Sequence, residues 1–150
     1  MSKTKGNVLL AFTLLITAFI FSQSALSAVD SSQESGSLLE VLMKLAACVH
    51  LPIELTEHMI RKMAHFIEFM VYGVFLSWTV HEKDKGFRGN IWKILFLLLI
   101  VPLIDETIQY SSPGRSAEVR DVLLDYSGAL TGFAVNAAAV KIRSVMKHDK

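Results

Sequence analysis

The chain has 150 residues, of which 52% are hydrophobic and 19% are charged, and its mean hydropathy is +0.44. A composition this apolar excludes an ordinary small soluble domain and predicts a membrane protein. The net charge is only +1, and no stretch is rich in lysine or arginine, so a nucleic-acid-binding protein is excluded as well.

The first apolar segment covers residues 8–29, and only two threonines interrupt its core, residues 8–21. A helix that crosses a membrane needs about 20 mostly apolar residues, so we expect the first span here. The same region also resembles a secretory signal peptide, because lysines precede the apolar core and small residues follow it at 24–28. Cleavage there would leave three spans.

A shorter apolar segment covers residues 38–51 and is too short to span. We expect an amphipathic helix that lies in the membrane interface and ends before Pro52. The polar run of residues 30–37 before it is equally well explained by a loop.

Residues 63–80, 91–108 and 122–140 have the length and composition of three further spans. The expected fold is therefore an all-α membrane bundle of about four transmembrane helices. Lysine and arginine concentrate on the cytoplasmic side of membrane proteins. Placing both termini in the cytoplasm puts most of the 15 basic residues on that side, so we expect this orientation.

The last three spans carry their ionisable residues at one end only. Because successive helices alternate in direction, these ends meet on one side, which the expected orientation makes the outer side. A charge in hydrocarbon costs several kcal/mol, so such residues are a functional-site hypothesis by default. The members of this polar cluster are Lys62, His65, Glu68, Asp105, Glu106, Gln109, Arg115 and Asp121.

On the first of these three helices, Lys62, His65 and Glu68 follow one another at intervals of three residues and share one face. Glu68 lies deepest and needs a partner. The partner expected from another segment is Arg115, because a guanidinium binds a carboxylate through two parallel hydrogen bonds.

On the next helix, Asp105 and Gln109 share a face, and Glu106 points to a different side. Two adjacent carboxylates near an apolar boundary repel each other, so we expect a proton or a nearby cation to compensate. The final span contains Gly128 and Gly132, whose spacing lets two helices approach closely.

These motifs, in this order, resemble the VanZ-like family of small bacterial membrane proteins. The resemblance covers about residues 61–133, and across the whole chain it implies a single VanZ-like domain, residues 1–150, in the bacterial cytoplasmic membrane and in contact with membrane lipids. The family takes its name from a member associated with resistance to the glycopeptide teicoplanin, which suggests a role in the cell envelope. The matching motifs are Lys62-x-x-His65-Phe66-x-x-Phe69, Asp105-Glu106-x-x-Gln109, Pro113-Gly114-Arg115, and Asp121-Val122 followed by Gly128-x-x-x-Gly132.

Several functions are compatible with the polar cluster. In a binding protein, Lys62 and Arg115 would hold an anionic group such as the pyrophosphate of a lipid-linked wall precursor, while carboxylates met amines or sugar hydroxyls of a precursor or a glycopeptide. In an intramembrane enzyme, His65 would be the general acid or base. A third hypothesis is a scaffold that binds a partner helix through its two glycines. The cluster also has a purely structural interpretation, as a network that fixes three helices.

We expect no cofactor. A zinc site with several imidazoles is excluded because only one histidine lies in the polar cluster, although His65 with neighbouring carboxylates leaves a mixed metal site open. The single cysteine, Cys48, cannot form an intrachain disulfide and is expected to be apolar filler.

Overall fold

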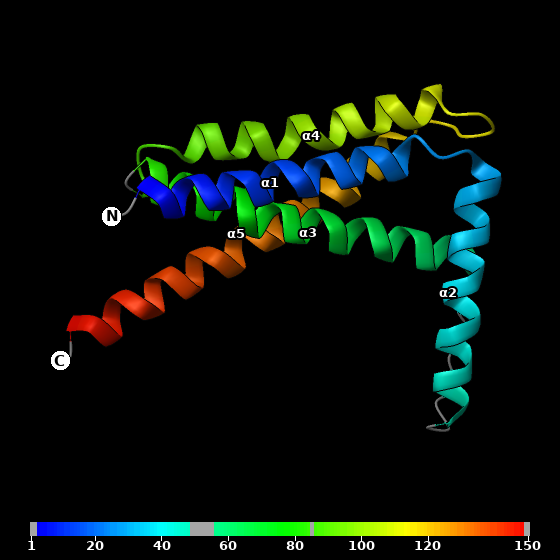
Figure 1. Ribbon diagram of the computed structural model, residues 1–150, viewed down its shortest axis with the longest axis horizontal. Coiled ribbons are helices and arrows are strands. Elements are labelled where there is room, and N and C mark those ends of the chain that lie inside the picture. The colour runs from blue at the N-terminus through cyan, green and yellow to red at the C-terminus, as the bar shows by residue number, and fades with distance from the viewer. Residues whose placement is uncertain (1–2, 49–55, 85, 149–150) are drawn as a thin grey trace.

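The computed structural model describes residues 3–48, 56–84 and 86–148, and within these ranges every regular element is an α-helix. Four of the helices run along one long axis, and α2 crosses that axis at one end (Figure 1). The expected all-α class is confirmed. In chain order the helices are α1 (Lys3–Ser24), α2 (Ala28–Cys48), α3 (Glu57–Lys83), α4 (Ile91–Ser111) and α5 (Val119–His148).

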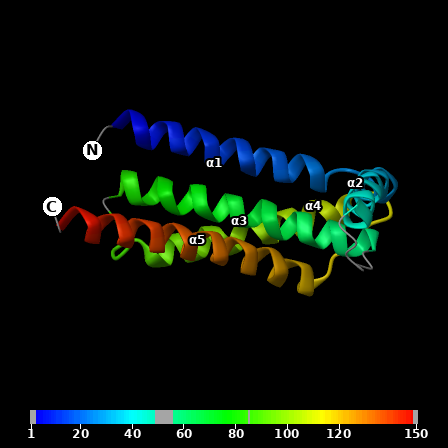
Figure 2. The ribbon, with the colours of Figure 1, turned by 90° about the horizontal axis from the view of Figure 1, so that it is seen from below.

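The central helix is α3, which contacts each of the other four helices (Figure 2). Its first turn is capped by Thr56, whose hydroxyl accepts a hydrogen bond from the N–H of Met59 at 3.2 Å. Apolar side chains along its length pack against α1, α4 and α5. The fully buried members of this core include Ile20, Phe69, Tyr72, Ile94, Leu98 and Ala129.

The closest helix contact joins α3 and α5 through glycines. A Cβ atom added at Gly128 would overlap the carbonyl oxygen of Phe66, and one at Gly132 would overlap that of Met70. Gly73 of α3 has the same relation to the α5 backbone. The expected close approach at Gly128 and Gly132 is confirmed, and α3 of the same chain is the neighbouring helix.

The expected end of the first span, residue 29, and the expected start of the next helix, residue 38, are both wrong, because α2 begins earlier in the chain. Helix α1 ends at Ser24, five residues before the expected end of the first span, because a new helix already begins at Ala28. Ser27 caps that helix, since its Oγ accepts a hydrogen bond from the N–H of Asp30 at 3.2 Å. The polar run of residues 30–37 is therefore helical and belongs to α2.

The expected interfacial helix at residues 38–51 is the second half of α2, and residues 49–51 lie outside the described part of the chain. The side chain of Cys48 also lies outside the described residues. Within the polar half, Gln23 of α1 donates a hydrogen bond to Glu34 at 3.2 Å. Such contacts explain why a polar sequence continues the helix rather than forming a loop.

The remaining helices extend beyond the expected spans: residues 57–83 against 63–80, 91–111 against 91–108, and 119–148 against 122–140. Among the described residues, α1 and α3 are the two helices that are long and apolar enough to cross a membrane. The extensions carry polar residues past the apolar part of each helix, so every member of the polar cluster except Arg115, which lies on the loop after α4, is held on a helix.

Candidate functional site

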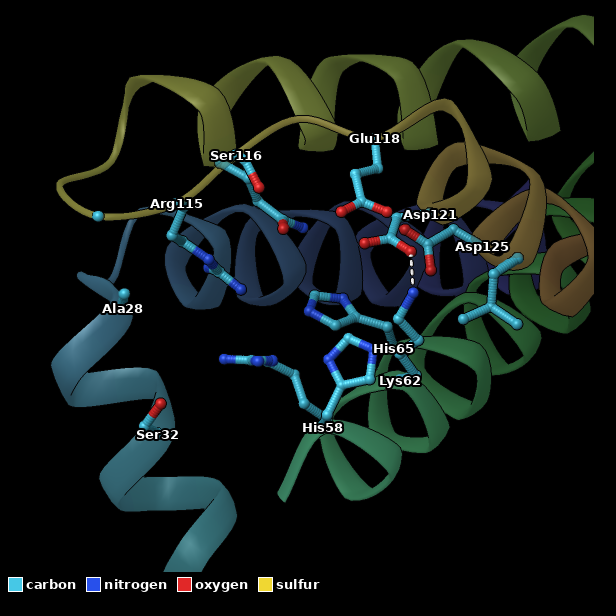
Figure 3. Close-up of a pocket in the computed structure, with 14 residues that line it drawn as sticks. Ala28, Ser32, His58, Lys62, His65, Arg115, Ser116, Glu118, Asp121 and Asp125 are labelled. Carbon is cyan, nitrogen blue, oxygen red and sulfur yellow. Dashed lines mark hydrogen bonds and ion pairs between the residues drawn. The ribbon is translucent and has the colours of Figure 1, made fainter. Parts of the chain in front are cut away.

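The polar cluster lies at the end of the bundle where α3 begins, α4 ends and α5 begins (Figure 1). An ion pair closes this end, because Nζ of Lys62 lies 2.5 Å from Oδ1 of Asp121 (Figure 3). The prediction that polar ends of separate helices meet is confirmed by this contact between α3 and α5.

A cavity of about 250 Å³, here called the charged pocket, opens between the start of α2, the start of α3, the loop after α4 and the start of α5. Figure 3 shows His58, His65 and Arg115 on one side of it and the carboxylates of Glu118, Asp121 and Asp125 on the other. Apart from Lys62, which pairs with Asp121, the labelled basic side chains of the charged pocket thus lie apart from the acidic ones. Of the polar cluster, the residues that line it are Lys62, His65, Gln109, Arg115 and Asp121.

Two arginines give the charged pocket its positive side. Arg61 and Arg115 both line it, and neither forms an ion pair with a carboxylate of the described residues. The guanidinium of Arg115 instead donates to the main-chain oxygens of Gln23 at 3.5 Å and Ser24 at 3.3 Å. Burial lowers the pKa of Arg115, and repulsion from Arg61 lowers it further. An anion between the two groups would relieve that repulsion.

The two adjacent carboxylates of α4 are buried and held by hydrogen bonds. Asp105 accepts one from the hydroxyl of Ser24 at 2.5 Å and one from the amide of Gln109 at 2.7 Å. Glu106 accepts one from the main-chain N–H of Glu118 at 2.6 Å. These bonds join α1, α4 and the start of α5, so the acidic pair has a structural role whatever else it does.

Below the ion pair, His65 and two carboxylates come together. His65, Asp105 and Asp125 each offer one ligand atom, and these atoms lie within 4.8 Å of one another. Asp125 is 1% exposed, and its Oδ1 has no hydrogen-bond partner among the described residues. Nδ1 of His65 also lacks one, although Oε2 of Glu68 lies 3.9 Å away. Within the part of the chain that the structure describes, these three residues form a group that could hold a metal ion.

The expected pairing of Glu68 with Arg115 is wrong. Arg115 donates to main-chain oxygens at the end of α1, and the ionisable side chain found close to Glu68 is His65, whose Nδ1 lies 3.9 Å from Oε2 of Glu68. The physical reason is that α1 ends beside the loop after α4, where its last carbonyls have no partner within their own helix and accept from the guanidinium. Glu68 lines a second cavity of about 200 Å³, next to the charged pocket, together with Arg61.

Sequence reasoning missed several residues of this site. Asp125 lies four positions after Asp121, so helical periodicity alone would have placed both on one face of α5. Arg61 directly precedes Lys62 at the start of α3. The sequence did not indicate a role for Ser24, because a serine near the end of an apolar segment does not reveal that its partner is Asp105. His58 is exposed in the first turn of α3 and also lines the charged pocket.

Two serines that follow one another at the end of α4 donate their hydroxyls to main-chain carbonyls. Oγ of Ser112 donates to the carbonyl of Ser24 at 3.0 Å, and Oγ of Ser111 donates to that of Thr107 at 3.2 Å. The arrangement as a whole offers positive groups for an anion on one side and acidic groups for an amine or a cation on the other.

A family model described as VanZ/LLP1 matches residues 9–140. The matched range contains the whole of α2, α3 and α4 and most of α1 and α5, and therefore the complete charged pocket. Comparisons with curated proteins and with solved structures found no match.

Proposed function

Because this chain belongs to the VanZ/LLP1 family, we propose that it is a multi-pass protein of the bacterial cytoplasmic membrane that binds a lipid-linked precursor of the cell wall. In this proposal α1, α3, α4 and α5 cross the membrane and α2 lies along its outer surface. The charged pocket faces outward and holds the anionic headgroup.

The outer faces of the lengthwise helices support a lipid environment. Large apolar side chains are exposed on them, including Leu15 at 66%, Phe96 at 62% and Leu123 at 58%. In water, an apolar surface spread over several helices would be an aggregation hazard, whereas lipid tails would cover it. Trp92, at 82% exposure, lies near the start of α4, where an aromatic ring fits the membrane interface.

The orientation is supported by the end of the bundle opposite the charged pocket. Both chain ends lie there (Figure 1). Its lysines form solvent-exposed pairs, in which Lys5 lies 2.6 Å from Glu82 and Lys93 lies 2.7 Å from Asp84. Basic residues of this kind favour the cytoplasmic side, which places the charged pocket outside.

We also propose that α1 stays part of the mature protein. Its last residue, Ser24, donates to the buried Asp105 and accepts from Arg115 and Ser112. The main-chain N–H of Ala28 donates to the carbonyl of Pro113 at 3.0 Å. Cleavage after Ser27 or Ala28 would separate α1 from the rest of the chain. If α1 then left, Asp105 would lose the hydrogen bond from the hydroxyl of Ser24.

The observation that carries the choice of ligand is the pair of arginines without carboxylate partners in the charged pocket. Asp121 already pairs with Lys62, so Arg61 and Arg115 are the lysine and arginine side chains of the charged pocket that have no ion-pair partner among the described residues. A guanidinium binds phosphate oxygens through two parallel hydrogen bonds. A phosphate or pyrophosphate group between the two arginines would satisfy both.

An apolar groove beside the charged pocket supports a lipid-linked rather than a soluble ligand. This groove of about 200 Å³ is lined by Met63, Phe66 and Ile67 of α3, and it shares Lys62 and Leu124 with the charged pocket. A headgroup in the charged pocket would therefore have a place for its hydrocarbon chain directly alongside. The combination fits an amphiphile whose anionic group joins a long apolar chain.

A contribution to teicoplanin resistance would follow from this activity. The charged pocket, at about 250 Å³, is smaller than the roughly 300–1,000 Å³ of cavities that enclose drug-sized molecules. We therefore propose that the protein acts on the precursor that the antibiotic recognises and not on the antibiotic itself.

The test is binding of a polyprenyl pyrophosphate to the purified protein in nanodiscs, followed by native mass spectrometry. Arg61→Ala and Arg115→Ala should each weaken binding about tenfold or more, because a hydrogen bond to a charged group contributes about 1.5–3 kcal/mol. Lys93→Ala, at the opposite end, is the matched control and should bind normally. Inorganic pyrophosphate should bind more weakly than the lipid-linked form, since it leaves the apolar groove empty. Unchanged binding in a stable Arg115→Ala protein would refute the proposal.

A second candidate is turnover of the same ligand with His65 as general acid or base. It is favoured by one observation, namely that the ring lines the charged pocket while Nδ1 has no hydrogen-bond partner among the described residues. Release of product from a labelled precursor by the wild-type protein, abolished in His65→Gln with binding retained, would establish an enzyme. Binding without any turnover would leave the binding function alone.

A further inference from the structure

The geometry points to a divalent metal ion held by His65, Asp105 and Asp125 at the floor of the charged pocket. The three residues come from α3, α4 and α5, so a single ion would join the three helices. This inference goes beyond the binding of an anionic lipid and does not depend on it. It also departs from the expectation, made from the sequence, that no cofactor is present.

The distances between the three ligand atoms suit one ion. These atoms lie within 4.8 Å of one another. An ion bound through nitrogen and oxygen at about 2.0–2.2 Å holds its ligand atoms about 3–4 Å apart, so small side-chain rotations would complete the site. Carboxylates merely gathered at a surface would not converge in this way with an imidazole from another helix.

Independent support comes from Asp125. Its side chain is buried, with 1% exposure, and its Oδ1 has no hydrogen-bond partner among the described residues. A buried, unpaired carboxylate oxygen is costly and calls for a specific explanation such as an ion or water. Neither Asp125 nor Asp105 forms an ion pair with a lysine, arginine or histidine of the described residues. A bound cation would supply the missing positive charge.

The surroundings resemble those that orient metal ligands. Asp105 is held by the hydroxyl of Ser24 and the amide of Gln109, and each carboxylate oxygen keeps a second lone pair for an ion. Glu68 lies 3.9 Å from Nδ1 of His65, on the side where a carboxylate commonly fixes the ring of a metal-binding histidine. The ligands are thus positioned before any ion arrives.

The donor set indicates which ions fit. One imidazole with two carboxylates suits a first-row divalent ion such as Mn²⁺ or Zn²⁺ better than Ca²⁺, which prefers six to eight oxygen ligands. Two carboxylates balance the charge of one divalent ion. His65 and Asp125 also line the charged pocket, which gives the ion an entry route and leaves positions on it for water or ligand oxygens.

The test is metal binding by the full-length protein in nanodiscs after treatment with a chelator. Titration with Mn²⁺, followed by electron paramagnetic resonance, should show one bound ion per chain, and Zn²⁺ should displace it. Asp125→Asn and His65→Gln should each weaken Mn²⁺ binding more than about tenfold, since even residues behind the ligands change affinity 10–100-fold. Asp84→Asn is the matched control, because it removes a carboxylate that is paired with Lys93 at the opposite end of the bundle and should change binding less than threefold.

A second readout keeps the inference testable where a variant fails to fold. Pulsed measurements on Mn²⁺ bound to the wild-type protein should show magnetic coupling to one imidazole nitrogen. Bound Mn²⁺ without nitrogen coupling, no stoichiometric binding of Mn²⁺ or Zn²⁺ by the wild type, or equal binding by folded Asp125→Asn would each overturn the site.

Discussion

The two ends of the bundle treat their charges differently. At the end that holds the chain termini, Lys5 pairs with Glu82, Lys93 pairs with Asp84, and the lysines are about half exposed. At the pocket end, Asp105 and Asp125 are buried, and two arginines line a cavity without carboxylate partners in the described ranges. Solvated pairs need no further partner, whereas buried or unpaired charges are candidates for contacts with a ligand. The position and pairing of charges, rather than their number, therefore mark the candidate functional end.

The largest loss of stability is expected at the close contact between α3 and α5, because both ends of the bundle are built on these two helices. Gly132→Leu should prevent α3 and α5 from approaching and should cost more than about 3 kcal/mol of folding free energy, because it places a side chain against backbone. Gly89→Ala is the control, since a Cβ there meets nothing within 4 Å. Thermal unfolding in detergent measures both. A Gly132→Leu protein as stable as the wild type would mean that the α3–α5 contact is wrong.

A smaller effect distinguishes a buried from an exposed serine on the same helix. Ser24→Ala removes the hydroxyl that donates to buried Asp105 and should lower the free energy of unfolding by about 1–3 kcal/mol. Ser22→Ala is matched to it, because Ser22 is exposed and donates only to a carbonyl of its own helix. Chemical denaturation of the two variants gives the difference. Equal stability would show that α1 does not complete the site.

The smallest effect is expected at the end with the chain termini. Lys5→Ala and Lys93→Ala each break a solvent-exposed ion pair, which typically contributes about 0–1 kcal/mol. Ligand and metal binding should be unchanged in both. A loss of binding comparable to that of Arg115→Ala would remove the distinction between the two ends.

Much of the fold was predictable because apolar length is a strong signal. The segments that became α3, α4 and α5 were recognised from composition, and helix alternation alone brought Lys62 and Asp121 to the same end. Polar helices give no such signal. The first half of α2 was therefore missed. The cap at Ser27, with which α2 begins inside the first apolar segment, was missed as well.

The site was predicted in outline but not in its pairings. Periodicity places residues on a face, yet it does not say which side chain from another helix reaches that face. Arg115 was assigned to Glu68, although the unpaired carbonyls at the end of α1 hold it instead. Asp125 was not counted in the polar cluster, and only the packing of three helices reveals its proximity to His65.

The most direct measurement is cysteine accessibility at the two ends in intact cells, with Cys48 replaced by serine. Ser116→Cys lies at the charged pocket and Gly89→Cys lies in the loop at the opposite end, and both positions are exposed. A membrane-impermeant maleimide should label position 116 in intact cells and position 89 only after permeabilisation. Labelling of both positions from the same side, or of position 116 only from the cytoplasm, would contradict an outward-facing pocket.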